Sequence, residues 1–398
     1  MSENFTCVHA GVCGGCTYQD KTYEEQLSIK ESAVRELMAP YADDDKWEAP
    51  VASPLAYGYR NKMEFSFGDT VKDGPLTLGL HQRKSFYNVI TVDGCNIVDE
   101  DYRLILRETL DFFSDNGVTY YHKKRHTGTL RHLVVRKAAN TKEILVMLVS
   151  TSELADEMAK SYAKRLTRLE KRLEGKFAGI LLAINDLPAD TVQAERLDIL
   201  YGQDFFYEEI LGLRFKISPF SFFQTNSLGA EKLYSVVRDY CGDVSGKKIF
   251  DLYSGTGTIA QVLSKIAGAG EVIGVEIVEE AVRAARENAG LNGLENCRFI
   301  AGDVFKVLDA QEELPEFIVL DPPREGMTPK ALSKILSYEV PKIVYVSCKP
   351  QSLARDMESF KYRGYEIERI RCVDMFPWTK NIETVCLLSK VVTRDGSN

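Results

Sequence analysis

The sequence predicts an α/β protein in which an α+β region precedes an open parallel sheet with helices on both faces. From about residue 223 onward, short apolar runs alternate with helical stretches, a pattern typical of such a sheet. Between about 50 and 217 the apolar runs are β-rich, and one charged helical stretch at 152–175 interrupts them. With 398 residues and 44% hydrophobic content, the chain is long enough to form two or three domains.

The first element expected is an amphipathic helix at 19–40. Its apolar residues from Tyr23 to Leu37 lie near helical spacing, and Pro40 would end it. The α+β region then offers strand candidates at 61–67, 85–92, 130–136, 144–149 and 179–184. We therefore expect three parts, which are 1–50 with the helix and a cysteine-rich loop, 51–217 as a central α+β domain, and 218–398 as the parallel-sheet domain.

The carboxyl-terminal part is expected to form a sheet of seven strands. Five of them alternate with helices such as 279–291 and 329–336, and they are 248–252, 272–276, 298–301, 317–320 and 343–346. Two more follow near 366–373 and 383–390 with only a short link between them. Because this link is too short for a crossover helix, we expect the last two strands to be an antiparallel pair at the end of the sheet.

Charge and hydropathy exclude some classes of function. The formal net charge of -8 argues against a protein that coats nucleic acid non-specifically, because such binding needs many Lys and Arg residues. The chain has no run of 18 apolar residues and its first residues lack a signal-peptide pattern, so we expect a cytoplasmic protein without membrane contact. A local basic stretch from His122 to Lys137 could be an RNA-facing patch or a solvated hairpin.

The cysteines of a cytosolic chain are not expected to form structural disulfides. Three of the nine, Cys7, Cys13 and Cys16, fall within ten residues, and two glycines separate the last two. With Cys95 as a distant fourth, this loop suits a site with four sulfur ligands. Zinc and a [4Fe–4S] cluster both accept four thiolates, so the ligand count does not choose between them, although the spacing is not that of a zinc ribbon.

Small residues follow the first strand of the parallel sheet, at the edge where ligands bind in open α/β folds. Tyr253-Ser-Gly255-Thr-Gly would let a ligand approach the backbone closely, and Ala260 replaces the third glycine of a dinucleotide fingerprint. Glu276 ends the second strand and can accept hydrogen bonds from ribose hydroxyls. These features favour a nucleoside cofactor without pyrophosphate, with S-adenosylmethionine as the leading candidate. Asp303 could border its adenine or cap the next helix.

Two further strands end in chemically distinctive residues. Asp321-Pro-Pro-Arg324 follows one of them, and the two prolines stiffen the loop. Amino-group methyltransferases often carry an aromatic residue in place of Arg324, so this tetrapeptide argues against amino methylation and leaves Asp321 to bind a base or the cofactor. Cys348 closes the next strand and places a thiol at the same edge.

Carbon methylation of a pyrimidine would explain this thiol. When a thiolate adds to carbon 6 of uracil, carbon 5 becomes nucleophilic enough to take a methyl group, and a base must then remove the proton from carbon 5. Glu383 is the candidate base, because it begins an antiparallel strand and so lies on the same edge as Cys348. Without Cys348, a glutamate that caps an edge strand would be the better interpretation.

Several motifs together resemble the S-adenosylmethionine-dependent RNA uracil-C5 (5-methyluridine) methyltransferases over nearly the whole chain. They are Cys7-x5-Cys13-Gly-Gly-Cys16, Tyr59-Arg-Asn-Lys-Met-Glu64, Asp93-Gly-Cys95, Ser221-Phe-Phe-Gln-Thr-Asn226, Asp251-Leu-Tyr-Ser-Gly255, Asp321-Pro-Pro-Arg-Glu-Gly326, Val346-Ser-Cys-Lys-Pro350 and Glu383-Thr. The resemblance implies a Rossmann-like seven-stranded methyltransferase domain, an RNA-binding central domain and an N-terminal iron–sulfur loop.

The same resemblance implies residue roles. Cys348 would be the nucleophile and Glu383 the base. The cofactor and target-base pocket would contain Gln224, Tyr253, Glu276 and Asp321, to which the residues above add Gly255 and Asp303. A [4Fe–4S] cluster would bind to Cys7, Cys13, Cys16 and Cys95.

The resemblance also implies a substrate. Many relatives carry a small β-barrel RNA-binding domain before the cysteine loop, whereas six residues precede Cys7 here, so RNA affinity is expected from the central domain and the catalytic face. The expected phosphate contacts are Arg60, Lys62, Arg131, His132 and Arg136. Members with a cluster typically modify 23S rRNA, which is the substrate expected here.

Three alternatives to this substrate and activity stay open. They are a uridine of the tRNA T-loop, cytosine carbon 5, and a non-catalytic RNA chaperone or ribosome-assembly factor. No obligate protein partner is inferred. The target nucleotide and the oligomeric state do not follow from the sequence.

Overall fold

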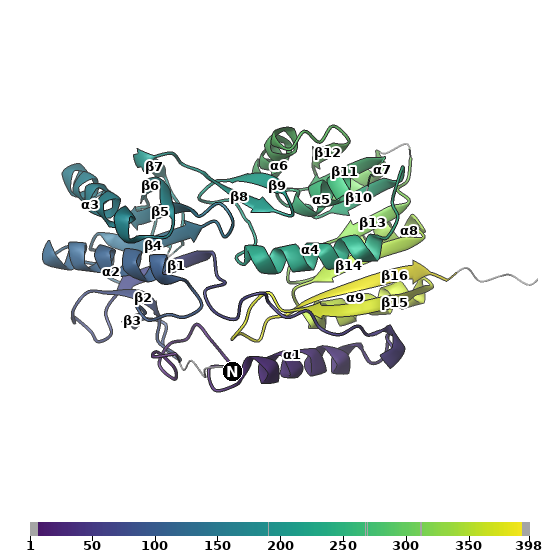
Figure 1. The fold of residues 1–398 in the computed structure, drawn as a ribbon, viewed down its shortest axis with the longest axis horizontal. Coiled ribbons are helices and arrows are strands. Elements are labelled where there is room, and N and C mark those ends of the chain that lie inside the picture. Colours follow the sequence, from purple (N-terminus) through teal and green to yellow (C-terminus); the bar gives the residue numbers. More distant parts are fainter. Residues whose placement is uncertain (1–6, 190, 267, 269, 311–312, 392–398) are drawn as a thin grey trace, which may run out of the picture.

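The computed structural model describes residues 7–189, 191–266, 268, 270–310 and 313–391. Two seven-stranded sheets lie side by side in this part of the chain, and a two-stranded sheet lies between them (Figure 1). The fold is mixed α/β, and the carboxyl-terminal sheet is Rossmann-like.

The first helix, α1 (Tyr23–Met38), begins in a capping box, because Thr22 Oγ1 accepts from Glu25 N at 3.2 Å and Glu25 Oε2 accepts from Thr22 N at 2.7 Å. Although α1 precedes the central domain in sequence, it lies along the carboxyl-terminal domain beside α9 (Figure 1). Val34 and Met38 are buried in the core of that domain. After a short 3₁₀ turn, η1 (Asp44–Lys46), the chain runs along the outer edge of the sheet.

The central domain contains seven strands in the order β3-β2-β1-β4-β5-β6-β7. They are β1 (Lys62–Gly68), β2 (Thr77–His81), β3 (Val89–Thr91), β4 (Leu130–Lys137), β5 (Glu143–Ser150), β6 (Lys176–Ile184) and β7 (Arg196–Gly202). Neighbours are antiparallel except β5 and β6, which α3 (Asp156–Leu169) and the 3₁₀ turn η2 (Glu170–Arg172) connect. Only the end of the expected strand 85–92 is a strand, because the residues before it form a tight loop.

Helix α2 (Glu100–Asp115) was not expected from the sequence. Its signal was present, because Asp99 caps the helix through Asp101 N at 3.0 Å and acidic residues fill the first turn. A hairpin, β8 (Phe206–Ile210) and β9 (Leu213–Ile217), follows the central sheet, and α4 (Ser227–Cys241) then leads into the carboxyl-terminal domain.

The carboxyl-terminal sheet has the order β12-β11-β10-β13-β14-β16-β15. Its strands are β10 (Lys248–Leu252), β11 (Glu271–Glu276), β12 (Cys297–Ala301), β13 (Phe317–Leu320), β14 (Lys342–Ser347), β15 (Tyr365–Val373) and β16 (Glu383–Lys390). The helices are α5 (Thr258–Ile266), α6 (Glu279–Leu291), α7 (Val304–Asp309), α8 (Pro329–Ser337) and α9 (Pro350–Tyr362). The five parallel strands and the antiparallel pair β15–β16 confirm the predicted arrangement.

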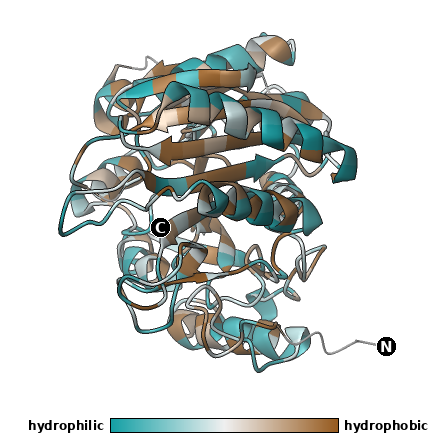
Figure 2. Ribbon diagram, turned by 90° about the vertical axis from the view of Figure 1, so that its left-hand side faces the viewer, coloured by the Kyte–Doolittle hydropathy of each residue, from teal (hydrophilic) through white to brown (hydrophobic). Residues whose placement is uncertain are grey.

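Both faces of this sheet are buried, which explains why its strands are continuous apolar runs. In β13, Ile318 and Leu320 pack with α8 and α9, while Phe317 and Val319 face the opposite core. That second core also contains residues of β5 and β6, so the two domains share hydrophobic packing. Figure 2 shows the brown, hydrophobic strands enclosed by helices whose outer faces are largely teal.

Among the residues described, no helix is long and apolar enough to cross a membrane.

Candidate active site

Cys348 and Glu383 lie next to each other at the edge of the carboxyl-terminal sheet. In the antiparallel pair of β14 and β16, Ser347 is opposite Thr384, so the residue after Ser347 and the residue before Thr384 occupy adjacent positions. Glu383 is 5% exposed and Cys348 is half-buried. The negative charge of Glu383 raises the pKa of Cys348, which places the two side chains within electrostatic reach.

Asp321 and Arg324 complete this group. Asp321 follows β13, the strand beside β14, and its backbone N donates to Leu252 O at 3.3 Å. The positive charge of Arg324 lowers the pKa of Cys348, and Arg324 Nη2 donates to Asn381 Oδ1 at 3.2 Å. The sequence had shown Arg324 only as a residue that argues against amino methylation. Its charge acts on both Cys348 and Glu383, so Arg324 is a candidate site residue that the sequence analysis did not include.

Burial raises the pKa of all three acidic groups, and the charge of Asp321 adds to the shifts of Glu383 and Cys348. Burial, with the charges of Glu383 and Asp321, raises the pKa of the Cys348 thiol to about 11. Burial and the charge of Asp321 raise the pKa of Glu383 to about 8, and burial raises the pKa of Asp321 to about 7. The positive charge of Arg324 lowers the pKa of both Cys348 and Glu383. The pocket therefore favours a single negative charge, stabilised by Arg324.

The loop after β10 is shaped for close approach by a ligand. Tyr253, Gly255 and Gly257 have positive φ angles of 67°, 54° and 76°. A Cβ atom at Gly257 would lie 2.4 Å from the ring of Phe299, whereas a Cβ at Gly255 would meet nothing within 4 Å. Gly257 is thus needed for packing, and Gly255 borders open space.

Glu276 lies at the end of β11 beside this loop. Its Oε2 accepts from Gly255 N at 3.0 Å and its Oε1 accepts from Val278 N at 2.9 Å. These bonds fix the carboxylate while its residue remains partly exposed. The next two residues, Ile277 and Val278, are 69% and 53% exposed, so apolar surface adjoins the carboxylate.

The remaining predicted cofactor residues lie around the same edge. Gln224 lies beside Tyr234, whose pKa is raised by burial and by the charges of Asp321, Asp251 and Glu383. Asp303 caps α7 by accepting from Phe305 N at 2.9 Å, which is the alternative role that the sequence allowed.

Asp251 is a buried group that the sequence argument did not single out by itself. Its Oδ2 accepts from Ala260 N at 3.0 Å, and its Oδ1 has no hydrogen-bond partner. Burial and the charge of Asp321 raise its pKa well above the usual range. It lies behind the glycine loop and ties the end of β10 to α5.

The four predicted ligand cysteines come together beside the central domain. The charges of Cys7, Cys13 and Cys95 all raise the pKa of Cys16, although burial has the larger effect. The loop is tied to β2, because Gly14 N donates to His81 O at 3.1 Å. No three of the four sulfur atoms, all in the described part of the chain, lie within 4.8 Å of one another.

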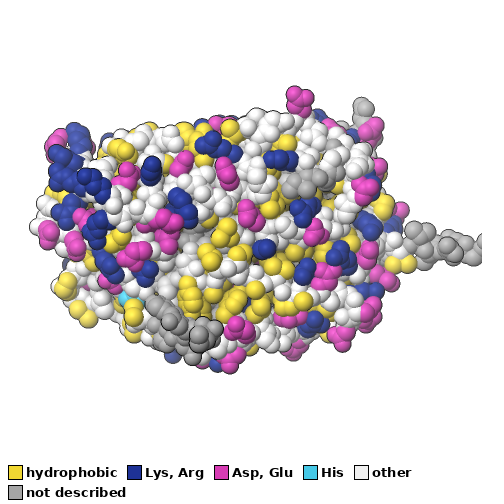
Figure 3. All heavy atoms as spheres, in the orientation of Figure 1, with side chains coloured by type: hydrophobic (Ala, Val, Ile, Leu, Met, Phe, Trp, Pro, Cys, Tyr) yellow, Lys and Arg dark blue, Asp and Glu magenta, His cyan; other side chains and the backbone are white. Residues whose placement is uncertain are grey.

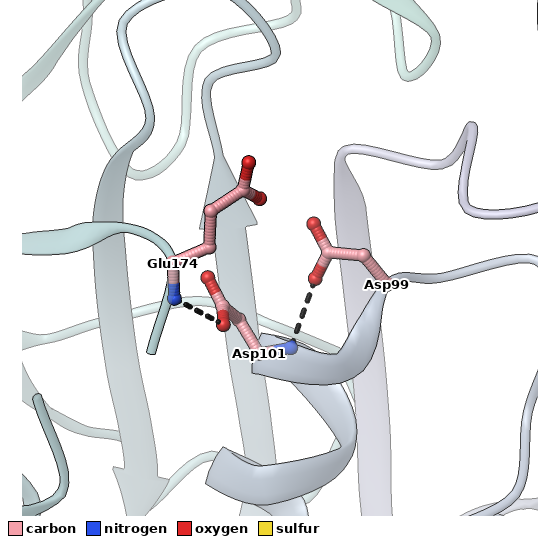
Figure 4. Close-up of side chains that lie close together, drawn as sticks. All are labelled: Asp99, Asp101 and Glu174. Atoms are coloured by element: carbon pink, nitrogen blue, oxygen red, sulfur yellow. Dashed lines mark hydrogen bonds between the residues drawn. The ribbon is translucent and has the colours of Figure 1, made fainter. Parts of the chain in front are cut away.

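A second cluster of acidic side chains is held together by a lysine. Asp99, Asp101 and Glu174 converge as shown in Figure 4. The ammonium group of Lys137 lies 2.6 Å, 2.7 Å and 2.8 Å from their respective carboxylates. Lys137 is buried, so this cation offsets the carboxylate charges within the fold, and the cluster is a structural ion-pair network.

The structure contradicts two of the expected phosphate contacts. Arg131 is buried and donates to Asn185 O and Leu187 O, both at 2.7 Å, while Arg136 is buried and donates to Ser218 O at 2.6 Å. Burial lowers the pKa of Arg136 to about 10. Both guanidinium groups therefore hold loops against the sheet by binding carbonyl oxygens. They are not available to phosphates.

The other three expected RNA contacts differ among themselves. His132 is 6% exposed, but its residue lines a cavity on the open face of the central sheet. Lys62 forms an ion pair with Glu64 at 2.7 Å. Arg60 is partly exposed, and its Nε donates to Lys62 O at 3.0 Å.

Comparison with known proteins identifies the family. The model of the tRNA (uracil-5-)-methyltransferase family matches residues 22–391. The chain belongs to this family. It is therefore an enzyme, an RNA (uracil-5-)-methyltransferase, and the edge formed by Cys348, Glu383, Asp321 and Arg324 is its candidate active site.

Relatives of this methyltransferase match over most of their length. An RNA methyltransferase of Caldanaerobacter subterraneus subsp. tengcongensis is 48% identical over 388 residues, which is 96% of this chain and 84% of the relative. An RNA methyltransferase of Bacteroides thetaiotaomicron is 33% identical over 403 residues, which is 96% of this chain and 87% of the relative. Among solved structures, the Pyrococcus abyssi tRNA (uracil-54, C5)-methyltransferase in complex with S-adenosyl-L-homocysteine is 28% identical, with a TM-score of 0.77 over 95% of this chain and 86% of its own.

Proposed function

We propose that this methyltransferase transfers a methyl group from S-adenosylmethionine to carbon 5 of a uridine in RNA through a covalent bond between Cys348 and carbon 6. The observation that carries the proposal is the adjacency of Cys348 and Glu383 across β14 and β16. A nucleophile and a base must both reach one pyrimidine ring, and these two side chains share one edge of the sheet.

The first step is addition of the thiolate. The Cys348 thiol loses its proton to solvent, and the positive charge of Arg324 stabilises the sulfur anion. Sγ then forms a bond to carbon 6, and the ring's negative charge makes carbon 5 nucleophilic. The bound methyl donor supplies an electrophilic methyl group, which carbon 5 takes while the carbonyl at carbon 4 is restored.

The second step restores the ring. Once Sγ is bonded to carbon and the methyl group has been transferred, the negative charge beside Glu383 is gone, so its carboxyl can ionise more easily. Glu383 then removes the proton from carbon 5, the bond between carbon 6 and Sγ breaks, and Cys348 leaves as thiolate. The proton on Glu383 returns to solvent. Asp321, with a pKa of about 7, can donate to or accept from the edge of the base.

The residues around Glu276 fit S-adenosylmethionine. The open space at Gly255 would suit the amino-acid moiety. The fixed carboxylate of Glu276 would accept from the ribose hydroxyls. The exposed apolar side chains of Ile277 and Val278 would suit the purine ring. Gln224, Tyr253 and Asp303 lie around the same edge. The Pyrococcus abyssi enzyme, with S-adenosyl-L-homocysteine bound, supports this assignment.

We also propose a [4Fe–4S] cluster on Cys7, Cys13, Cys16 and Cys95. The nearness of the four cysteines, whose charges raise the pKa of Cys16, supports a site with four sulfur ligands. The resemblance to cluster-bearing relatives favours a cluster over zinc. The cluster would hold the loop against β2 and would have no redox role in methyl transfer.

The proposed substrate is 23S rRNA, because the chain combines the uracil methyltransferase motifs with this cysteine loop. Transfer RNA is the second candidate, since both the family model and the Pyrococcus abyssi enzyme are described as acting on tRNA. Transcripts of each RNA, incubated with the enzyme and a labelled methyl donor, distinguish the two. A cytoplasmic location is proposed from the nine free cysteines.

Two substitutions test the mechanism. Cys348→Ala should abolish methylation and form no covalent complex, because no sulfur is left to add to carbon 6. Glu383→Gln should methylate carbon 5 and then stall, so a protein–RNA complex that survives denaturing electrophoresis should accumulate. If Cys348→Ala keeps an RNA-folding activity and wild type has no methyltransferase activity, the chain is a chaperone, and the proposal is wrong.

A further inference from the structure

Two neighbouring loops of the central domain expose aromatic and basic side chains together. In the β2–β3 loop, 82–88, the side chains of Phe86 and Tyr87 are 86% and 61% exposed. In the loop 122–126, the Lys124 ammonium lies 4.5 Å from the centre of the Tyr87 ring. Single exposed apolar residues are common on protein surfaces, but two adjacent aromatic rings beside cations are the composition of a base-stacking surface.

The two segments that carry these rings are basic, although the whole chain is acidic and Asp73 pairs with Arg125 of the second loop at 3.0 Å. The sequence contains no Asp or Glu between Gln82 and Val92, or between Val118 and Lys142, whereas the formal net charge of the chain is -8. Arg83, Lys84, Lys123 and Lys124 belong to these two segments. A patch of this kind in an acidic protein favours a polyanion at one place and does not make the whole surface bind nucleic acid.

The β2–β3 loop is held in one conformation. Gln82 N donates to Asn88 O at 2.9 Å, and Ser85 Oγ accepts from Asn88 N at 3.1 Å. Arg83 is fixed to the cysteine loop, because its Nη2 donates to Cys16 O at 2.8 Å. The aromatic side chains are therefore presented by an ordered loop, which reduces the entropy lost on binding.

A groove adjoins Phe86. Its volume is about 600 Å³, and Gly14, Gly15, His81, Phe86 and Lys123 are among its lining residues. His81 also lines a second cavity of about 420 Å³ with Ser66 and His132, on the open face of the central sheet.

Strand β1 runs from this second cavity toward the segment that contains Gln224. Its Ser66 borders the second cavity, and Asn61, just before the strand, donates from its backbone N to Thr225 O at 2.8 Å. Thr225 is the neighbour of Gln224. The path along β1 is roughly 17 Å long at about 3.3 Å per residue, a distance that a few nucleotides can span.

We propose that the surface formed by Phe86, Tyr87, Lys84 and Lys124 binds a single-stranded segment of the substrate RNA that flanks the target uridine. Unpaired bases stack on Phe86 and Tyr87, and the two lysines contact phosphates. The strand then follows the open face of the sheet to the pocket of Cys348. This inference rests on the proposed function, because it takes the ligand to be the RNA substrate.

The test measures the affinity of the full-length protein for a fluorescent single-stranded RNA of about 12 nucleotides, taken from the methylated region. Phe86→Ala/Tyr87→Ala should raise Kd by at least about 5- to 150-fold, which is the loss expected from a single stacked base. Lys84→Ala/Lys124→Ala should lower the slope of log K against log salt by about 1.4, because each phosphate contact to a single strand contributes about 0.7. Affinity for S-adenosyl-L-homocysteine should stay unchanged in both variants.

Matched controls lie elsewhere on the surface. Tyr362, at the end of α9, is 89% exposed and serves as the aromatic control. Lys164 and Arg168 are exposed on α3, and Figure 3 shows Lys and Arg side chains gathered at the upper left. The control Lys164→Ala/Arg168→Ala removes two positive charges, as Lys84→Ala/Lys124→Ala does. The proposal would be overturned if the test and control variants had equal effects on RNA affinity. It would also be overturned if Phe86→Ala/Tyr87→Ala left Kd and KM for RNA unchanged, and binding of a protein to this surface would not rescue it.

The same measurements separate this inference from the proposed function. If the wild-type enzyme methylates uridine but the loop variants bind and methylate RNA normally, the docking surface is wrong and the function stands. If the loop variants lose RNA affinity while no uridine is methylated by the wild type, the surface stands and the function is wrong.

Discussion

Glu383 is a carboxyl group that the fold keeps buried between a thiol and a second carboxyl. Its environment is what a general base for carbon 5 needs, because a raised pKa makes the carboxylate a stronger proton acceptor. Burial and Asp321 raise the pKa to about 8, while Arg324 acts in the opposite direction. The same burial has a cost for the folded state, and this cost can be measured.

We predict that Glu383→Gln makes stability less dependent on pH. The pKa of Glu383 is raised from 4.5 to about 8 in the folded chain, so the folded state holds this proton more tightly. The stability due to this protonation is fully present below pH 4.5 and is lost as pH rises through 8. Relative to wild type, the Gln variant should therefore gain about 1 kcal/mol or more between pH 5 and pH 8, or roughly 2 °C in melting temperature.

The measurement is a melting temperature at both pH values for each protein. Glu366→Gln is the control, because Glu366 is exposed on the neighbouring strand β15 and its replacement should leave the pH dependence unchanged. An identical pH dependence in wild type and Glu383→Gln would show that Glu383 is ionised at low pH and would remove this argument for its role as a base.

At the scale of elements, the loop between β15 and β16 is the part that positions Glu383, and residues from distant segments fasten it. Lys30 of α1 donates to Asp374 Oδ1 at 2.9 Å and to Phe376 O at 3.0 Å, and both side chains of this ion pair are fully buried. Trp378 has a positive φ of 69° and donates from Nε1 to Ala56 O at 2.6 Å. Helix α1 therefore helps to build the catalytic edge from outside the domain.

We predict that Lys30→Met destabilises the protein by about 3–5 kcal/mol. The substitution leaves the Asp374 carboxylate buried without its cation, which is far more costly than the loss of an exposed pair. Urea unfolding followed by tryptophan fluorescence measures the change. Lys21→Met is the control, because Lys21 pairs with Asp20 at the surface and should cost less than about 1 kcal/mol. A loss below 1 kcal/mol for Lys30→Met would mean that Asp374 is neutral in the folded protein.

Elements with strong local signals could be predicted from the sequence. The strands of the carboxyl-terminal sheet were predictable because burial on both faces makes them continuous apolar runs. The meeting of Cys348 and Glu383 was predictable because the short link before Glu383 requires an antiparallel strand. In these cases the information lies in one segment or in two segments with a fixed geometric relation.

Features that depend on which distant segments pack together were not predictable. The amphipathic pattern of α1 shows that one face is buried, but it does not show that Val34 packs against the carboxyl-terminal domain. The pattern of β4 does not show whether Arg131 and Arg136 bind carbonyl oxygens or phosphates, because both partners attract a guanidinium group. The role of Arg324 depends on its distance to Cys348, which only the fold sets.

At the scale of the whole molecule, the cysteine loop lies where the two domains meet. Thr17 N and Tyr18 N both donate to Trp378 O, at 2.8 Å and 3.0 Å, while Gly14 N donates to His81 O of β2. One loop therefore contacts both the β15–β16 loop before Glu383 and the central domain that is proposed to bind RNA. A cluster bound by this loop would fix the surface near the RNA more than the cofactor site.

We predict that Cys95→Ala removes the cluster and weakens RNA binding, while affinity for S-adenosyl-L-homocysteine changes less than twofold. Without the fourth ligand only hydrogen bonds such as Gly14 N to His81 O hold the loop to the central domain, and the groove beside Gly14 and Arg83 is less firmly shaped. Iron content should fall from about four atoms per chain toward zero, and Kd for RNA should rise about tenfold. Cys297→Ala, a single buried cysteine on β12, should keep its iron and serves as the control. Equal losses of RNA and cofactor affinity would instead mean that the cluster supports the whole fold. Normal RNA affinity in the iron-free protein would mean that the cysteine loop has no role in RNA recognition.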